Sequence, residues 1–151
     1  MAAFKFRLAT ILKLREATQD ERRRELAEAY HVDEVLAGRE QGIDAQLEHL
    51  RQQCRMASRV GTVDVDTLVV AGRHELMLRA QLRDLARQRE HVAAEIEQRR
   101  ERLVEATQAV RALEKLREKQ LAQHEEEEQR LADKEMDEVG VRRWRPQEVE
   151  A

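Results

Sequence analysis

The side chains that could do chemistry in this chain are five histidines, one cysteine and many carboxylates. The histidines are too widely spaced along the sequence for two of them to meet within one helical turn: His31, His49, His74, His91 and His124. No HExxH sequence, no paired cysteines and no glycine-rich phosphate loop is present. The carboxylates fit a solvated helix surface, which has no concave pocket to shift their pKa values. We therefore expect no catalytic residue, no metal ligand and no cofactor, and a protein that is not an enzyme.

The elements that hold these side chains must be helices, because the composition does not suit a compact globule. Among 151 residues there are only one Trp, one Tyr and two Phe, while 39% are charged, against roughly 25% in an average soluble domain. One proline, Pro146, leaves long stretches free to be helical. The 28 basic and 31 acidic residues are interleaved with Leu, Val and Ile, which favours a salt-bridged helix over disorder. The net charge of −3 argues against nucleic acid as the main partner.

A seven-residue apolar pattern runs from Phe4 to about Ser58, with spacings that alternate between three and four residues as in a coiled-coil seam. The residues at its two core positions are Ala29, Leu36, Ile43, Leu50 and Ala57, and Leu12, Leu26, Leu47 and Cys54. Charged residues interrupt the seam, so we expect loose pairing there: Arg15, Arg22, Asp33 and Glu40. Gly38 and Gly42 predict either a soft spot or a close approach by a partner.

The helical pattern lapses once inside the chain, from Arg59 to Asp66. Gly61 is suited to end the first helix, and Thr62, Asp64 or Asp66 can cap the second. A stronger seam follows. Its two core positions hold Leu68, Leu82, Ile96, Leu103 and Val110, and Leu78, Leu85, Val92, Ala106 and Leu113.

A tight connection between two long helices forces them to run antiparallel. We therefore predict an all-α fold, a long antiparallel two-helix coiled coil (an α-helical hairpin) with an overhanging second helix. The single domain covers residues 1–151, with the first helix at about 4–58, the turn at about 59–65, the second helix at about 66–141 and a tail at 142–151. Beyond about Gln120 the second helix should have no partner in the first.

Three charged features could bind a partner. The first is the basic start, where Lys5, Arg7, Lys13 and Arg15 precede any acid, accompanied by the apolar residues Phe4, Phe6 and Ile11; a docking surface and simple solvation are both open readings. The second is the acidic stretch 125–138, which we expect to be a solvated face. The third is Trp144 with its arginine neighbours, which we expect to be part of a frayed tail.

Both ends of the chain resemble the flagellar export protein FliJ family. The start, Phe4-Lys5-Phe6-Arg7-Leu8 and then Ile11-Leu12-Lys13-Leu14-Arg15-Glu16, resembles the opening FxFRLxxLLxLRE of that family. Residues 113–120, reading LEKLREKQ, resemble its LEKLRE block, and residues 135–139, reading EMDEV, resemble its closing ELDE. The sequence departs from the family at Gly140, where the family tends to have Ala, and in its tail from Trp144 to Ala151.

The resemblance implies a non-enzymatic component of the flagellar type III protein export apparatus. Members of the family are thought to insert a stalk-like coiled coil into the ring of the export ATPase FliI, to contact the export gate protein FlhA and to escort export chaperones. The residues that would contact the ATPase lie in segments that the hairpin places side by side at its open end: Phe4, Phe6, Arg7, Ile11, Lys13, Arg15, Leu116, Arg117, Asp137 and Glu138.

Two other functions stay open on the sequence. A structural coiled-coil spacer or scaffold would pair its helices between chains, and an arginine-rich nucleic-acid-binding helix is the weakest alternative. No apolar run approaches the roughly 20 residues that span a bilayer. We expect a cytoplasmic protein, a monomer when free, that associates with the inner membrane at the flagellar base only through its partners, without small-molecule substrate or nucleic acid.

Overall fold

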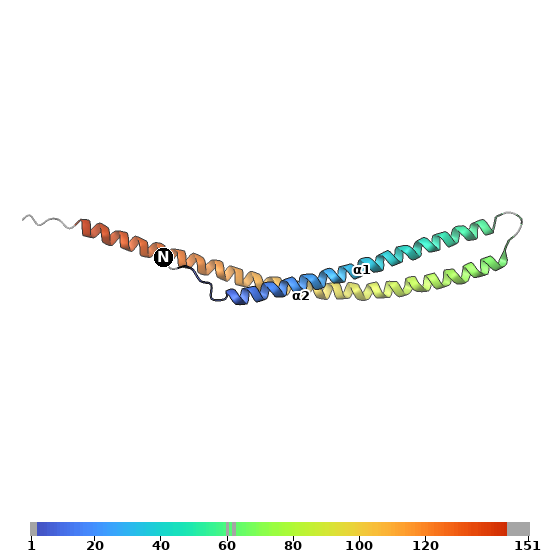
Figure 1. The fold of residues 1–151 in the computed structure, drawn as a ribbon, viewed down its shortest axis with the longest axis horizontal. Helices are drawn as coiled ribbons and strands as arrows, with labels where there is room; N and C mark the ends of the chain where they lie inside the picture. The colour runs from blue at the N-terminus through green and yellow to red at the C-terminus, as the bar shows by residue number, and fades with distance from the viewer. Residues whose placement is uncertain (1–2, 60, 62, 145–151) are drawn as a thin grey trace, which may run out of the picture. The chain divides into compact units, whose positions relative to one another are not determined.

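Two α-helices make up the secondary structure of the chain, and the residues that can be described form no strand (Figure 1). Helix α1 is Ala9–Ala57 and helix α2 is Val65–Arg143. The structure is a computed structural model that describes residues 3–59, 61 and 63–144. No helix of this described part has a stretch apolar enough to cross a bilayer.

Contacts divide the chain into two units, each built from part of both helices. One unit is Asp20–Glu105, and we call it the turn unit because it contains the connection between the helices. The other combines Met1–Gln19 with Ala106–Ala151, and we call it the terminal unit.

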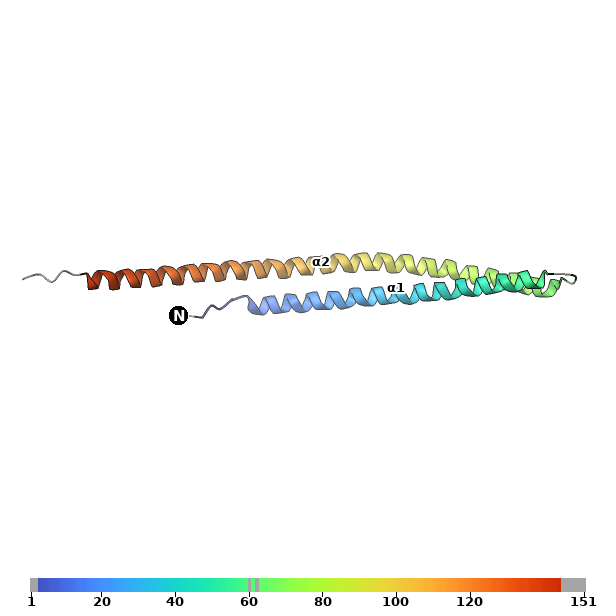
Figure 2. The same cartoon turned by 90° about the horizontal axis from the view of Figure 1, so that it is seen from above.

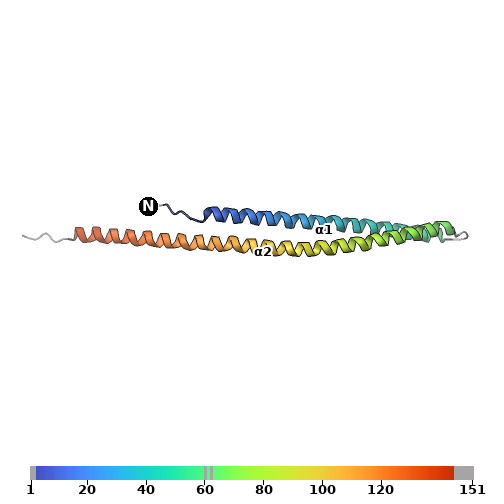
Figure 3. The ribbon, with the colours of Figure 1, turned by 90° about the horizontal axis from the view of Figure 1, so that it is seen from below.

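In the turn unit the two helices lie side by side in all three ribbon views (Figures 1, 2 and 3). Arg99 of α2 donates a hydrogen bond to the backbone oxygen of Glu25, and Arg89 donates one to Asp33. The partner number in α2 falls as the residue number in α1 rises, so the helices run antiparallel. The predicted all-α helical hairpin is therefore confirmed, and its helices pair within one chain.

The core is the narrow seam that the seven-residue patterns predict. Nine apolar side chains of the described residues are buried: Leu12, Ala29, Leu36, Leu47, Ala71, Leu78, Leu85, Ile96 and Val110. Every predicted core residue is either among these or half-buried. Ala71 is an addition that the pattern missed, because alanine is too common on helix surfaces to mark a core position by itself.

The connection between the helices lies where the pattern lapses. After α1, the backbone N–H of Ser58 donates to the oxygen of Cys54 at 3.1 Å, and the Ser58 hydroxyl donates to the same oxygen at 2.8 Å. Gly61 has a φ of +92°, a conformation that glycine adopts without strain. It thus serves the turn itself, four residues after the end of α1, rather than the helix terminus. Thr62 lies outside the described residues.

Asp64 caps α2, one of the three candidates named from the sequence. Its Oδ1 accepts a hydrogen bond from the backbone N–H of Thr67 at 3.3 Å, and its Oδ2 accepts one from the Thr67 hydroxyl at 2.5 Å. These bonds, the hydroxyl first, hold the pKa of Asp64 below its ordinary value. The cap satisfies one of the backbone donors that the first turn of a helix leaves without a partner.

The terminal unit corrects the predicted start of the first helix. α1 begins at Ala9 and not near residue 4, and the chain before it is not helical. From Ala3 to Ala9 the side chains alternate, with Phe4, Phe6 and Leu8 half-buried and the residues between them exposed. Residues 3–6 form no helix or strand, and residues 7 and 8 form a turn in which the backbone N–H of Ala9 donates to the oxygen of Phe6 at 3.2 Å. The FKFRL sequence already contains this alternation of apolar and basic residues.

The C-terminal end of α2 lies closer to its predicted position than the start of α1 does. The helix continues through Gly140 to Arg143, two residues beyond the expected end, and the backbone N–H of Trp144 still donates to the oxygen of Gly140. A single glycine costs a helix only about 1 kcal/mol relative to alanine, which a long helix tolerates. The remainder of the predicted tail, residues 145–151, lies outside the described part.

Candidate protein-docking site

The start of the chain lies on α2 of its own unit. The rings of Phe4 and His124 are tilted by 39° with their centroids 5.7 Å apart, within the range for a favourable aromatic contact. This contact covers α2 at least as far as His124, although Phe4 lies before the first helix and is not part of it. Phe4 and Phe6 are half-buried within the chain.

A cleft of about 320 Å³ opens between this segment and the two helices of the terminal unit. Its wall is formed by Phe4, Phe6, Ala9, Leu12, Lys13, Glu16 and Arg117. Two aromatic rings and a buried leucine therefore stand beside two cations and one carboxylate. Such an arrangement suits an apolar side chain of a partner whose neighbours are acidic.

Of the predicted cations, Lys13 and Arg117 line this cleft. Arg7, Lys13 and Arg15 are exposed, as is Lys5. Ile11 has 45% of its surface exposed and Leu14 has 65%. Because they lie three residues apart on α1, they make an exposed apolar pair between the basic side chains. Of the predicted apolar contacts near the start of the chain, Ile11 is thus exposed to a partner, and Leu14 is a further exposed residue that was not among the predicted contacts.

The four predicted residues of α2 divide into two groups. Arg117 lines the cleft, and its neighbour Leu116 is exposed. Asp137 and Glu138 are exposed too, but they follow Arg117 by about twenty positions, which is about 30 Å along a helix. Figure 3 shows the red end of α2 running on past the first turns of α1. The structure therefore does not bring the acidic pair to the basic cleft.

A buried polar pair in the same unit was not foreseen. Gln19, only 9% exposed, occupies a seam position of α1, and its Nε2 donates a hydrogen bond to Oγ1 of Thr107 in α2 at 3.0 Å. A buried amide needs such a partner. The signal in the sequence was its place seven residues after Leu12 and seven before Leu26.

In the turn unit, the charged seam positions Asp33 and Glu40 are paired across the helices, whereas Arg22 is paired with Glu25 of its own helix. Arg89 Nε donates to Oδ1 of Asp33 at 3.1 Å, and its Nη1 donates to Oε2 of Glu40 at 2.7 Å. Both hydrogen bonds raise the pKa of Arg89, the one to Asp33 most. One guanidinium thus satisfies two of the four charges predicted to loosen the seam. Arg89 could have been found in the sequence, because it falls on the seam of the second pattern.

The turn unit also exposes apolar side chains that the sequence analysis missed. Val65, Val69 and Leu76 are 64%, 49% and 68% exposed, and their spacing places them on one side of α2. The sequence analysis followed one apolar seam along each helix, so it did not include this second apolar face.

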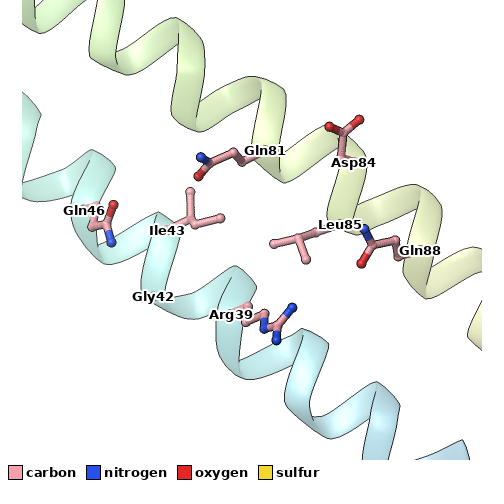
Figure 4. A pocket seen from close by; sticks show the side chains of 8 residues that line it. All are labelled: Arg39, Gly42, Ile43, Gln46, Gln81, Asp84, Leu85 and Gln88. Atoms are coloured by element: carbon pink, nitrogen blue, oxygen red, sulfur yellow. The ribbon is translucent and has the colours of Figure 1, made fainter.

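A shallow groove of about 490 Å³ runs between the helices of the turn unit at Gly42. In Figure 4, Ile43 of α1 and Leu85 of α2 form its apolar floor, with polar side chains such as Gln81 and Gln88 around them. A side chain added at Gly42 or Gly38 would meet nothing within 4 Å. The helices of this chain therefore do not require either glycine for close packing, and the approach of a partner stays a prediction.

Within the described residues, no three His, Cys, Asp or Glu side chains gather closely enough to hold a metal ion. The features that remain are the basic apolar cleft, the exposed faces of α2 and the paired seam. They define a helical-hairpin coiled coil whose surfaces suit contacts with other proteins.

The flagellar FliJ protein family matches residues 4–148, which is nearly the whole chain. The chain therefore belongs to the FliJ family and is a component of the flagellar type III export apparatus. Proteins of this family are structural components of that apparatus and are not known enzymes, and their partners are other proteins of the apparatus. Neither the curated proteins nor the solved structures gave a match to this chain.

Proposed function

We propose that this protein is the stalk of the flagellar export ATPase, with the terminal unit as the part that enters the ATPase ring. The observation that carries the proposal is the cleft, where the start of the chain and Arg117 of α2 present exposed cations around apolar side chains. The contact residues are those named from the sequence, with the half-buried Phe4 and Phe6 shaping the cleft rather than projecting from it. Family membership supports the location at the flagellar base.

The same protein contacts the export gate and escorts export chaperones, and it is held at the inner membrane by these partners. It is a monomer when free, because the seam residues of α1 and α2 bury one another within one chain. No observation favours a spacer that pairs its helices between chains. Light scattering on the free protein tests this part, and a stable dimer would contradict it.

The test of the ATPase contact removes three basic charges from the start of the chain, one of them Lys13 of the cleft, without touching the seam. Arg7, Lys13 and Arg15 are exposed, so replacing all three by Ala should leave the helical content and the melting temperature nearly unchanged. Binding to the purified export ATPase should weaken at least about tenfold and lose part of its salt dependence, because charges at an interface steer association.

The matched control removes three exposed arginines from the turn unit, Arg24, Arg39 and Arg59, again to Ala. It changes the net charge equally and should bind like the parent. Each variant is titrated against the ATPase at low and at physiological salt, with circular dichroism recorded alongside. Equal affinities for both variants would remove the terminal unit from the interface.

A further inference from the structure

The end of α2 has an unpartnered face with the spacing of a coiled-coil seam. Every residue from Gln129 to Trp144 is exposed. Within and just before this stretch, five residues follow one another at alternating steps of three and four: Glu125, Glu128, Ala132, Glu135 and Val139. Such steps keep side chains on one side of a helix. Met136 borders this set, since it lies four residues after Ala132. We call these six residues the overhang face.

The overhang face combines apolar and acidic side chains, and the first bases to follow it on the same side are Arg142 and Arg143, three and four residues after Val139. Met136 is 74% exposed and Val139 is 51% exposed. The only bases between Glu125 and Glu138 are Arg130 and Lys134. Both lie two residues from Ala132, and side chains two apart on a helix do not share a face. Arg130 is also engaged by Glu126 at 2.6 Å. A partner on this face would therefore meet carboxylates beside apolar groups, and one of these carboxylates, Glu128, lies 3.4 Å from Nε2 of His124.

The turn unit shows how this protein covers a face of the same kind. There Asp33, Leu36 and Glu40 follow one another at steps of three and four on α1, and α2 covers them. Leu36 is only 6% exposed, and Arg89 of the covering helix bridges both acids. Glu128, Ala132 and Glu135 repeat this order of acid, apolar residue and acid. No helix of the described chain covers them.

We propose that the overhang face binds an amphipathic α-helix of a partner protein, with Arg or Lys at its seam positions between apolar residues. A base of the partner helix meets Glu128 and Glu135 as Arg89 meets Asp33 and Glu40, and its apolar residues pack on Ala132, Met136 and Val139. This inference rests on the proposed function, since it gives the chemistry of a partner that docks at the terminal unit. It concerns a different surface from the basic cleft.

The probe is a synthetic helical peptide of about four turns with Leu at core positions and one Arg in each heptad. A second peptide has Glu in place of each Arg. Fluorescence anisotropy with the full-length protein should show binding of the Arg peptide, weaker at higher salt, and at least about tenfold weaker binding of the Glu peptide. Equal binding of both peptides, or of neither, would overturn the proposal.

Charge reversal then tests the face itself. The variant with Glu128→Lys and Glu135→Lys should prefer the Glu peptide. A matched control with Glu127→Lys and Asp133→Lys has the same net charge, but these residues lie off the overhang face, so it should still prefer the Arg peptide. If both variants come to prefer the Glu peptide, binding depends on the net charge of the protein and not on the overhang face, and the proposal is wrong.

Two further measurements separate the outcomes. Val139→Asn should weaken binding of the Arg peptide while circular dichroism stays unchanged, and an unaltered affinity would remove the apolar contact from the proposal. The free protein is also examined by sedimentation. If it forms a dimer that the reversal of Glu128 and Glu135 abolishes, the overhang face binds a second copy of this chain, and the proposal of a different partner protein is wrong. ATPase binding is measured on the same variants. Failure of the parent protein to bind the Arg peptide while it still binds the ATPase rejects this inference, whereas failure of the parent to bind the ATPase rejects the proposed function.

Discussion

Nη1 of Arg89 in α2 donates a hydrogen bond to Oε2 of Glu40 in α1 over 2.7 Å, and the same guanidinium binds Asp33. The three side chains are about one third exposed, so they lie at the edge of the seam. Because a sliding of one helix by a heptad would separate Arg89 from one of its acids, this cluster favours one register of the hairpin.

We expect Arg89→Leu to lower the melting temperature, because it leaves Asp33 and Glu40 close together without their cation. Replacing all three residues by Leu should restore the melting temperature or raise it, since a charged cluster in a seam is seldom more stabilising than apolar packing. Circular dichroism melts of the parent, the single variant and the triple variant check this. A single variant that melts like the parent would show that the cluster does not contribute to stability.

The seam makes a prediction that two leucines of one helix turn can test. Leu78 is 2% exposed and Leu76 is 68% exposed. Leu78→Ala should lower the free energy of unfolding by about 2 to 5 kcal/mol because it empties a packed site. Leu76→Ala should change it by less than about 0.5 kcal/mol, as is usual for a surface position. Denaturant unfolding of both variants is the measurement, and similar losses would mean that the register is wrong.

The hydrogen bond between Gln19 and Thr107 can be isolated by a double-mutant cycle. Gln19→Ala and Thr107→Ala should each destabilise the protein, and their effects should fall short of additivity by about 0.5 to 1.5 kcal/mol, the net contribution of one hydrogen bond. Additive effects would indicate that the two side chains do not interact in solution. Thr18→Ala serves as the control for Thr107→Ala in the cycle, because the Thr18 hydroxyl bonds only within its own helix.

The contact of Phe4 with His124 predicts how trypsin will cut the start of the chain. Phe4→Ala together with Phe6→Ala should release the segment before α1 from α2, so cleavage after Lys5 and Arg7 should become faster. Leu14→Ala, which changes an exposed side chain of the same unit, should leave the cleavage rate unchanged. Mass spectrometry of a digestion time course gives both rates. Equal rates in all three proteins would show that the aromatic rings do not hold the segment.

The cap at the start of α2 predicts a dependence on pH. The pKa of Asp64 lies below its ordinary value in the folded protein because of its bonds from Thr67. A depressed folded pKa means that the cap stabilises the protein above the pKa of the unfolded chain and loses this contribution as the pH falls through the folded pKa. Glu25, with its pKa lowered by its hydrogen bond from Arg22, acts in the same direction.

Asp64→Asn keeps a side-chain acceptor but cannot titrate. The melting temperature of the parent should therefore fall more steeply below the ordinary carboxyl range than that of the variant. Thermal melts over a series of acidic buffers measure the two slopes. Parallel slopes would exclude Asp64 as a source of the acid sensitivity.

Much of this architecture follows from local features of the sequence. The steps of three and four from Leu12 to Leu47 and from Leu78 to Val110 mark the buried seam, because an α-helix has a fixed period and only one face can be covered by a single partner helix. Asp64 and Gly61 mark the connection for equally local reasons, one as a cap and the other as the residue suited to a positive φ.

Contacts between the two helices could not be predicted from the sequence, because they depend on how α1 and α2 pack together. Which charges meet across the seam depends on the register of α1 against α2, so Arg89 finds Asp33 and Glu40, and Gln19 finds Thr107, over separations of 49 to 88 residues. The ring of Phe4, at the start of the chain, meets the ring of His124 in a distant segment. A pattern within one helix shows which face is buried, whereas the residue opposite each position is a property of the pair.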